Sequence, residues 1–315
     1  MAHMQWKNET SITKFILLGF GNLNKVQILL FVLFLVIYVL TMAGNLLMVA
    51  LVVADQQLHT PMYFFLGNLS FLETCYTSVI APRLLAGFLV EDRTISYRDC
   101  ITQLFFFGAL ASIECSLLAV MAYDRYLAIC NPLRYKVMMN LRVCLLLVSA
   151  SWITGFSASA SVVGMVPDLN FCGPKEINNF FCDMEELLKL SCAKSPLVEM
   201  TILVSCSLVS LVPFLFIIVS YVLILSAILR IASSAGRQKA FSTCASHLLV
   251  VSLYYGTIII MYMTPSAELS PGFHKALSLM YMVITPMFNP IIYSLRNQEV
   301  KGAFRKVIMQ NLGMI

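Results

Sequence analysis

The chain has 315 residues, of which 59% are hydrophobic and only 12% are charged, and its mean hydropathy is +0.84. A soluble domain carries about 25% charged residues, so this composition excludes an ordinary soluble protein. The net charge of +5 is modest, and the Lys and Arg residues are scattered between apolar runs. Because they form no basic stripe with interleaved aromatic residues, we expect no binding to nucleic acid.

Seven apolar runs follow one another along the chain. Each is long enough for the roughly 20 residues that cross a bilayer. They predict an all-α membrane protein, a bundle of seven transmembrane helices within a domain of residues 26–296. We expect the helices at about residues 26–54, 60–88, 97–126, 141–166, 199–231, 239–264 and 272–296.

The two ends of the chain are expected on opposite sides of the membrane. Lys and Arg are nearly balanced between the sides, but Asn8-Glu9-Thr10 is an N-glycosylation sequon in the polar segment 1–25. The long loop 167–198 lies on the same side, and its cysteines suit an oxidising compartment. We therefore place residues 1–25 outside the cell and residues 297–315 in the cytoplasm. The tail has the pattern of a short amphipathic helix that lies on a membrane surface.

Two acids and two amides fall inside the apolar runs at comparable depth. Glu114 lies roughly 16 Å and Glu73 roughly 20 Å from the inner surface, at 1.5 Å per helical residue. Asn45 and Asn289 lie near the same level. Because unpaired charge is costly in lipid, the acids must share a cation, share protons or be neutral within a hydrogen-bonded structural cluster.

The cysteines divide into two groups. There are ten, and no C-x-x-C pair is present, which argues against a zinc site. Four of them, Cys100, Cys172, Cys182 and Cys192, fall on the outer side. Four cysteines allow three pairings, and the residues themselves do not choose among them.

The third apolar run ends in the charged pair Asp124-Arg125. Such a pair marks the point where a helix leaves the membrane. Arg125 keeps its charge at any physiological pH, so it can exchange partners at the inner surface. Further along, Pro213 and Pro290 each remove a helix hydrogen bond and predict kinks.

Several motifs carry a resemblance to one family. Residues 121–135, M-A-Y-D-R-Y-L-A-I-C-N-P-L-R-Y, resemble the end of the third helix of olfactory receptors, a branch of the rhodopsin-like G-protein-coupled receptors. The resemblance extends to Gly44-Asn45, to H-T-P-M-Y-F-F-L at 59–66, to K-A-F-S-T-C-A-S-H-L at 239–248 and to P-M-F-N-P-I-I-Y-S-L-R-N at 286–297. The chain is similar to the class II, tetrapod-type members.

The resemblance implies roles for individual residues. It implies the disulfides Cys100–Cys182 and Cys172–Cys192, and a sodium-type site at Asn45, Glu73, Glu114 and Asn289. Many relatives have Asp where this chain has Glu73, so the geometry of that site is open. No other metal and no cofactor is expected. The implied residues for G-protein coupling and switching are Asp124, Arg125, Tyr126, Tyr221, His247, Asn289, Pro290 and Tyr293.

The ligand cavity of the family corresponds to the outer half of the bundle. One face of the sixth run carries Tyr255, Ile258, Ile259 and Tyr262 at helical spacing. No fixed charge lies among the corresponding positions, which favours a small, neutral, mostly apolar ligand with one hydrogen-bonding group. Amine receptors have Asp where this chain has Phe107. The other implied positions are Phe107, Gly108, Ala111, Ser112, Ile202, Ser205, Cys206, Val209, Ser278 and Tyr281.

The sequence thus predicts an odorant receptor that binds a volatile ligand and raises cyclic AMP through a stimulatory, olfactory-type G protein. We find no catalytic constellation and expect no enzyme activity. The resemblance implies a multi-pass protein of the plasma membrane of olfactory cilia. One alternative is a rhodopsin-like receptor for a metabolite or lipid. A transporter or channel is disfavoured by the odd number of helices and the absence of inverted repeats.

Overall fold

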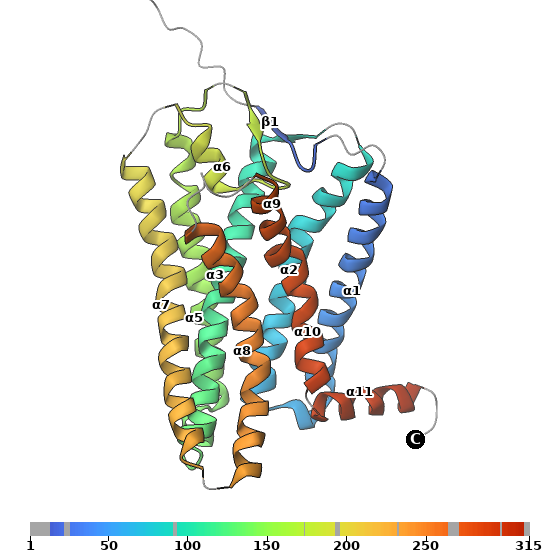
Figure 1. Cartoon of the computed structure of the whole chain (residues 1–315), viewed down its shortest axis with the longest axis vertical. Coiled ribbons are helices and arrows are strands. Elements are labelled where there is room, and N and C mark those ends of the chain that lie inside the picture. The colour runs from blue at the N-terminus through green and yellow to red at the C-terminus, as the bar shows by residue number, and fades with distance from the viewer. Residues whose placement is uncertain are drawn as a thin grey trace, which may run out of the picture.

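Long helices pack side by side into a bundle in the computed structural model (Figure 1). The structure describes residues 13–21, 26–90, 93–172, 174–192, 196–231, 233–263, 271–296 and 298–311. The expected sequon at Asn8 lies outside these residues. The long helices are α1 (Gln27–Ala54), α2 (Pro61–Leu89), α3 (Tyr97–Cys130), α5 (Leu141–Val163), α7 (Pro196–Leu229) and α8 (Ser234–Met263).

The seventh helix has three parts. It consists of α9 (Pro271–Leu279), a π-helical turn (Met280–Ile284) and α10 (Thr285–Arg296), which contains Pro290. π-helical turns inside α-helices occur mostly at functional sites. Helix α1 approaches this helix closely, because a Cβ added at Gly44 would lie 3.1 Å from Cγ of Pro290. Only glycine allows that approach without a shift of the neighbour.

Five described helices are apolar and long enough to cross a membrane by length and composition alone: Gln27–Ala54, Tyr97–Cys130, Leu141–Asp168, Pro196–Leu229 and Lys275–Tyr293. Helices α2 and α8 are more polar, but their 29 and 30 residues also suffice. At 1.5 Å per residue each is about 44 Å long, more than the bilayer core. Both pack within the bundle, α2 against α1 and α3 and α8 against α10. The architecture is the expected all-α bundle of seven membrane-spanning helices.

Several helices extend beyond the expected boundaries. Helix α3 continues to Cys130 rather than residue 126, α7 begins at Pro196 rather than 199, and α8 begins at Ser234 rather than 239. Helix α5 is shorter, since it ends at Val163 and not at 166, and α1 begins one residue later than expected. Hydrophobicity marks the part of a helix in lipid, whereas backbone hydrogen bonding continues into the aqueous layer. The expected boundaries therefore mark the lipid region better than the helix ends.

A small sheet covers the outer end of the bundle, and the sequence did not predict it. Strand β1 (Lys14–Leu17) lies between β2 (Thr94–Ser96), which is antiparallel to it, and β3 (Glu176–Ile177), which is parallel. Residues 13–21, the described part of the N-terminal segment, are therefore not simply a polar extension. Phe15 of β1 is fully buried and belongs to a hydrophobic cluster that includes Cys100 and Cys182.

The opposite end of the bundle carries short helices. Helix α4 (Tyr135–Met138) lies in the loop after α3, and a 3-10 turn (Gln56–Leu58) follows α1. Helix α11 (Gln298–Asn311) lies across the bundle axis at this end (Figure 1). It is held there by an ion pair of 3.6 Å between Lys306 and Asp55 and by a hydrogen bond of 2.6 Å from Tyr63 to Glu299. It is the expected short amphipathic helix.

Candidate functional site

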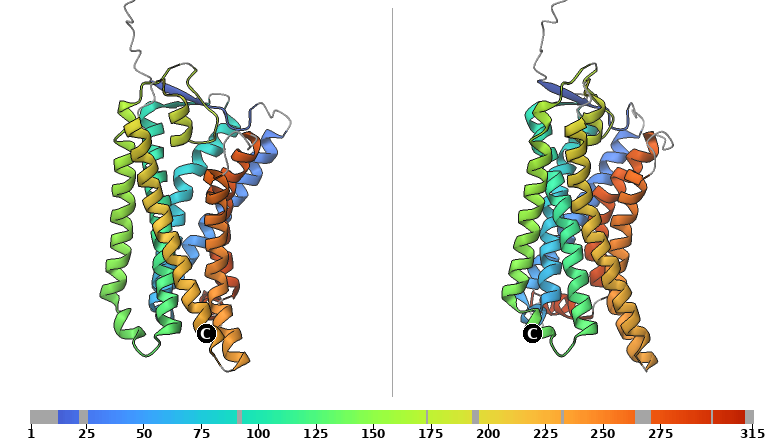
Figure 2. Two further views of the ribbon diagram at one scale, coloured as in Figure 1. Left: turned by 60° about the vertical axis from the view of Figure 1, so that its left-hand side comes forward. Right: turned by 90° about the vertical axis from the view of Figure 1, so that its left-hand side faces the viewer.

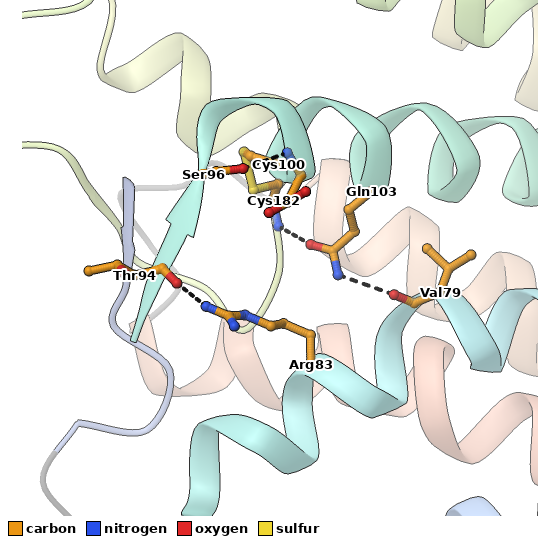
Figure 3. Close-up of a disulfide and its surroundings, with 8 residues drawn as sticks. Val79, Arg83, Thr94, Ser96, Cys100, Gln103 and Cys182 are labelled. Carbon is orange, nitrogen blue, oxygen red and sulfur yellow. Dashed lines mark hydrogen bonds between the residues drawn. A yellow bond between two sulfur atoms is a disulfide. The ribbon is translucent and has the colours of Figure 1, made fainter. Parts of the chain in front are cut away.

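The outer loop is fastened to the top of α3. Cys100 forms a disulfide with Cys182 in the loop that leads to α6 (Met184–Lys189). Gln103, one helical turn below Cys100, strengthens this link (Figure 3). Its side-chain oxygen accepts a hydrogen bond of 3.0 Å from the Cys182 amide, and its nitrogen donates one of 3.3 Å to the carbonyl of Val79 in α2. One side chain thus joins the loop, α3 and α2.

A second disulfide closes the outer loop on itself. It joins Cys172 to Cys192, and both disulfides are the pairs that the family resemblance implies. Backbone hydrogen bonds flank it, of 3.1 Å from Cys172 to Leu190 and of 2.8 Å from Cys192 to Asn170. The loop is therefore a folded cover, which Figure 2 shows above the helix ends in two further views.

Asp183 is a buried acid in this cover, outside the membrane-spanning helices. Burial, together with the nearby charge of Glu185, raises the pKa of its carboxyl from an ordinary 3.8 to about 6. The unfolded chain therefore loses this proton at lower pH than the folded one. Consequently the folded state loses stability as the pH rises from about 4 to about 6.

We predict that Asp183→Asn stabilises the protein at neutral pH, because the amide carries no charge to desolvate. The shift of about two pKa units corresponds to a gain of up to about 3 kcal/mol in unfolding free energy at pH 7. No gain is expected below about pH 4, where Asp183 is protonated in both states. Thermal unfolding of the purified protein at both pH values measures this, with the exposed Asp168→Asn as control. A destabilised variant at pH 7 would contradict the prediction.

Phe107 lies at the centre of an aromatic cage in the outer half of the bundle. Its ring centroid is 4.9 Å from that of Phe181, 5.5 Å from that of Tyr76 and 6.1 Å from that of Tyr281. These residues come from the outer loop, α2 and the π-helical turn. Tyr281 was a predicted site residue, whereas Phe181 and Tyr76 were not. Phe181 adjoins Cys182, so the disulfide itself could have pointed to it.

Gly108 does not face this cage. A Cβ added at Gly108 would lie 3.1 Å from the hydroxyl of Ser159 in α5, so the residue packs against the neighbouring helix. Successive helical residues point about 100° apart, so Gly108 and Phe107 take different directions, and the role of Gly108 in the ligand cavity stays a prediction. Ser112 is half-buried and donates to the Gly108 carbonyl at 2.7 Å.

The remaining predicted cavity residues differ in exposure. Ile202 is buried in the outer cluster with Cys182, and Ser278 is buried in the seventh helix. Cys206 is exposed, and Ile259 is 38% exposed. The side chain of Tyr262 lies outside the described part of the structure. The half-buried members are Ala111, Ser205, Val209 and Ile258.

Tyr254 and Tyr255 join α8 to its neighbours. The Tyr254 hydroxyl donates to the carbonyl of Ala111 at 2.9 Å and lies 3.5 Å from the sulfur of Cys115. The Tyr255 ring packs on Phe214 of α7, with centroids 4.7 Å apart. Tyr255 was predicted and Tyr254 was not. Tyr254 thus ties α8 to the α3 backbone at Ala111, three residues before Glu114.

Three of the four predicted polar residues, Glu73, Glu114 and Asn289, interact in the middle of the bundle, and Asn45 bonds to the backbone of the seventh helix nearby. Glu73 accepts a hydrogen bond from Asn289, and its carboxyl group lies within hydrogen-bonding reach of that of Glu114. Asn45 donates to the Pro286 carbonyl at 3.1 Å. Each of the four side chains is at most 2% exposed. One oxygen of each makes no hydrogen bond within the described structure: Asn45 Oδ1, Glu73 Oε2, Glu114 Oε1 and Asn289 Oδ1.

At the inner end of α3, Asp124 and Arg125 have different surroundings. Asp124 accepts a hydrogen bond of 2.7 Å from Tyr135 of α4, whose role the sequence did not reveal. Arg125 is only 8% exposed, and its Nε makes no hydrogen bond within the described structure. The neighbouring Tyr126 is half-buried and stacks on Tyr123, with centroids 6.4 Å apart.

His247 of α8 joins three helices near Arg125. One ring nitrogen lies 2.6 Å from the hydroxyl of Tyr221 in α7, and the other lies 3.1 Å from the carbonyl of Leu118 in α3. Tyr293 of α10 is buried in the same region. The inner ends of α3, α7, α8 and α10 therefore meet in one polar cluster around a buried cation.

Comparison with known proteins identifies the family. A family model described as "Olfactory receptor" matches residues 34–311. The chain belongs to the olfactory receptor family. Olfactory receptor 5AP2 of Mus musculus is 48% identical over 305 residues, 97% of this chain and 96% of that receptor. Olfactory receptor 11L1 of Homo sapiens is 49% identical over 312 residues, 99% of this chain and 97% of that receptor.

The fold agrees with this family. The structure of squid rhodopsin covers 91% of this chain and 80% of its own, with a TM-score of 0.72 and 17% sequence identity, and this likeness shows the fold alone. The receptor is a multi-pass membrane protein and not an enzyme. As an olfactory receptor it has a small-molecule ligand and a heterotrimeric G protein as partners. The structural features above can now be related to these two partners.

Proposed function

We propose that this receptor binds a small, neutral, mostly apolar volatile odorant and raises cyclic AMP through a stimulatory, olfactory-type G protein. The ligand lies among α3, α7, α8 and the seventh helix, beneath the outer loop. The cage around Phe107 supports this most directly. It consists of phenyl and phenol rings, which offer apolar surface and hydroxyl groups but no fixed charge.

The proposed mechanism is a shift between two populations of the receptor. An odorant that packs better in the active state favours it by the difference between its affinities for the two states. Tyr254 links the cavity wall on α8 to α3, and His247 links the inner part of α8 to α3 and α7. Movement of α8 would break the second set of contacts and open the region beside Arg125 to the G protein. We further propose the plasma membrane of olfactory cilia as the location, with the N-terminus outside.

A cyclic AMP assay of cells expressing the receptor, screened against an odorant panel, tests this function. At least one neutral volatile should raise cyclic AMP in a concentration-dependent way, and cells without the receptor should not respond. If only charged ligands are active, the proposed ligand class is wrong. If an active ligand triggers a G protein but no rise in cyclic AMP, the proposed coupling is wrong.

We predict that Phe107→Ala weakens the odorant response. Loss of the ring removes its apolar contacts with the ligand, worth about 1.5–3 kcal/mol, so the half-maximal concentration should rise by roughly ten- to a hundredfold. The adjacent Phe106, which is 42% exposed, provides the matched control Phe106→Ala. Surface expression of both variants must be compared by antibody labelling. An unchanged dose–response curve for Phe107→Ala would remove this cage from the ligand site.

We also propose that the polar cluster binds a sodium ion. Within the described structure, one oxygen of each of the linked Glu73, Glu114 and Asn289 side chains makes no hydrogen bond, and Asn45 Oδ1 on the adjacent helix α1 is a fourth such oxygen. Oxygen atoms are the ligands that hard cations prefer. A single shared proton would satisfy the two carboxyl groups but leave the amide oxygens of Asn45 and Asn289 without a partner. The residues thus fit a cation better than a proton. The ion supplies positive charge, while Asn45 and Asn289 hold their oxygens in place through their own bonds to the backbone and Glu73.

Replacing sodium with choline at equal ionic strength should lower the thermal stability of the receptor. At a sodium concentration ten times its Kd, binding stabilises the folded state by about 1.4 kcal/mol. Glu114→Gln preserves the size of the side chain and should remove most of the sodium dependence. Equal stability of the wild type in both salts would favour the shared proton and overturn the sodium site.

A further inference from the structure

A second cavity lies outside the proposed odorant site. It has a volume of about 50 Å³ and lies between the segment after β1 and the outer ends of α1 and α2. Its walls include Phe20, Phe88, Phe180, Gly87 and two basic residues, Arg83 and Arg93. None of these residues belongs to the cage around Phe107 or to the inner polar clusters. The cavity is therefore distinct from the proposed odorant site and from the proposed sodium site.

Two basic side chains line this cavity. Arg83 donates to the carbonyl of Thr94 (Figure 3), and Arg93 donates to the carbonyls of Leu18 at 3.2 Å and Gly21 at 2.7 Å. These acceptors are neutral. Neither guanidinium forms an ion pair within the described structure, which omits residues 91–92. Each retains N–H donors that could bind an anion in the planar geometry that guanidinium offers to carboxylates.

Three phenylalanines form a close-packed aromatic part of the wall, beside Leu17, Leu84, Gln27 and three glycines. Phe20 and Phe180 have centroids 4.4 Å apart, and Phe20 and Phe88 have centroids 5.9 Å apart. An occupant therefore meets apolar surface on one side and positive charge on the other. This combination suits an organic anion with a short apolar part better than a bare inorganic ion.

The size of the cavity limits the length of that apolar part. A water molecule needs about 10–15 Å³ of such space, so the cavity holds about four non-hydrogen atoms, or a few more with slight widening. Leu84 separates it from a smaller cavity of about 10 Å³ between α1, α2 and the π-helical turn. That space holds at most about one water molecule. A long acyl chain would therefore find no continuation toward the π-helical turn.

We propose that this cavity is a second binding site, for a small organic carboxylate of about two to four carbons. Arg83 and Arg93 bind the carboxylate, and the rings of Phe20, Phe88 and Phe180 cover the short alkyl part. The site lies beneath the N-terminal segment, which Lys275 of the seventh helix also holds by a hydrogen bond of 2.6 Å to the Gly19 carbonyl.

Gly87 permits a test that leaves both arginines in place. A Cβ added at Gly87 would have no heavy atom within 4 Å, so a larger side chain enters open space at the cavity wall. Gly87→Leu should fill the cavity without a clash, and it should abolish binding of butyrate. Gly302→Leu is the matched control, because Gly302 of α11 is exposed and its position is equally open.

The experiment uses the purified full-length receptor in nanodiscs and saturation-transfer NMR with butyrate. For about six non-hydrogen atoms, a Kd near the millimolar range is expected. Arg83→Gln and Arg93→Gln should each weaken binding at least tenfold. Arg98→Gln, which removes the same charge from an exposed position, should not. Thermal unfolding of each variant shows whether it remains folded. If an arginine variant does not fold, Gly87→Leu still tests the site, because it leaves both arginines in place.

Competition with other ligands shows which kind of anion the cavity binds. Butanol, a neutral analogue, should not displace butyrate. If octanoate binds more tightly than butyrate, the occupant is a lipid-derived chain and the proposal is wrong. If inorganic phosphate displaces butyrate equally well, the site does not recognise the alkyl part, and the proposal is again wrong. Binding that persists in Gly87→Leu would place butyrate elsewhere.

Discussion

Replacing Arg125 with Ala is expected to reduce odorant-dependent cyclic AMP production to the unliganded level. Odorant binding should be nearly unchanged, because Arg125 lies at the inner end of α3 and the cage around Phe107 lies in the outer half. The eighteen positions between them correspond to about 27 Å along the helix. A variant that binds but does not signal would separate coupling from recognition.

The reason for this expectation is the unusual state of Arg125. It is a permanent cation, only 8% exposed, and its neighbour Asp124 bonds to Tyr135. Arg125 forms no ion pair within the described residues. Because a buried charge without an ion pair is costly, an arrangement that exposes it to a new acceptor is favoured. The contacts of His247 with Tyr221 and Leu118 hold α8 beside it. Release of α8 would let Arg125 meet the G protein, and alanine offers no such group.

Radioligand or fluorescent-odorant binding, cyclic AMP and surface expression should be measured on the same cells. Arg142→Ala removes an exposed charge at the same side of the membrane and serves as control. Arg125→Lys restores the charge but not the planar donor fork, so partial signalling is expected. Full signalling by Arg125→Ala would show that Arg125 is only an anchor at the membrane surface.

The bundle could be predicted from the sequence because each membrane-spanning helix is marked by a pattern within its own residues. Each long helix is marked by an apolar run, and a charged pair such as Asp124-Arg125 marks where lipid ends. The interaction of Glu73, Glu114 and Asn289 also followed from their depth, since unpaired polar groups in lipid must meet each other. These are one-dimensional properties that do not require knowledge of how helices pack.

The outer sheet could not be predicted in this way. Strand β1 has four residues, and its partners β2 and β3 lie far away in the sequence. Such pairing leaves no periodic pattern in any short window. The π-helical turn that carries Tyr281 also could not be predicted from the sequence, because its residues are ordinary helix and strand formers.

The cavity residues show where helical spacing alone fails. Gly108 was assigned to the cavity for its small size, but its direction along α3 sends it toward Ser159. Phe181 and Tyr254 were missed because one lies on a loop and the other is adjacent to the predicted Tyr255. Side-chain direction depends on the rotation of each helix in the bundle, which the sequence does not contain.

Loss of the disulfide between Cys100 and Cys182 is expected to reduce folding and surface expression strongly. Its cysteines are 82 residues apart, whereas Cys172 and Cys192 are 20 apart. By the chain-entropy relation, closing the longer loop stabilises the fold by about 4.5 kcal/mol and the shorter by about 3.3 kcal/mol. The longer link also fixes the position of Phe181 against Phe107. Cys182→Ser should therefore lower both the stability of the fold and the affinity for the ligand.

We expect Cys182→Ser to remove most receptor from the cell surface and Cys172→Ser to remove less. Flow cytometry with an N-terminal tag measures this, and the half-buried free cysteine in Cys130→Ser provides the control. The double variant Cys100→Ser/Cys182→Ser should match the single one, because both remove the same bond. If Cys182→Ser reaches the surface normally and still responds to odorant, Gln103 and the surrounding apolar cluster hold the loop without the disulfide. That result would make the hydrogen bond of Gln103, and not the covalent link, the main attachment of the loop to α3.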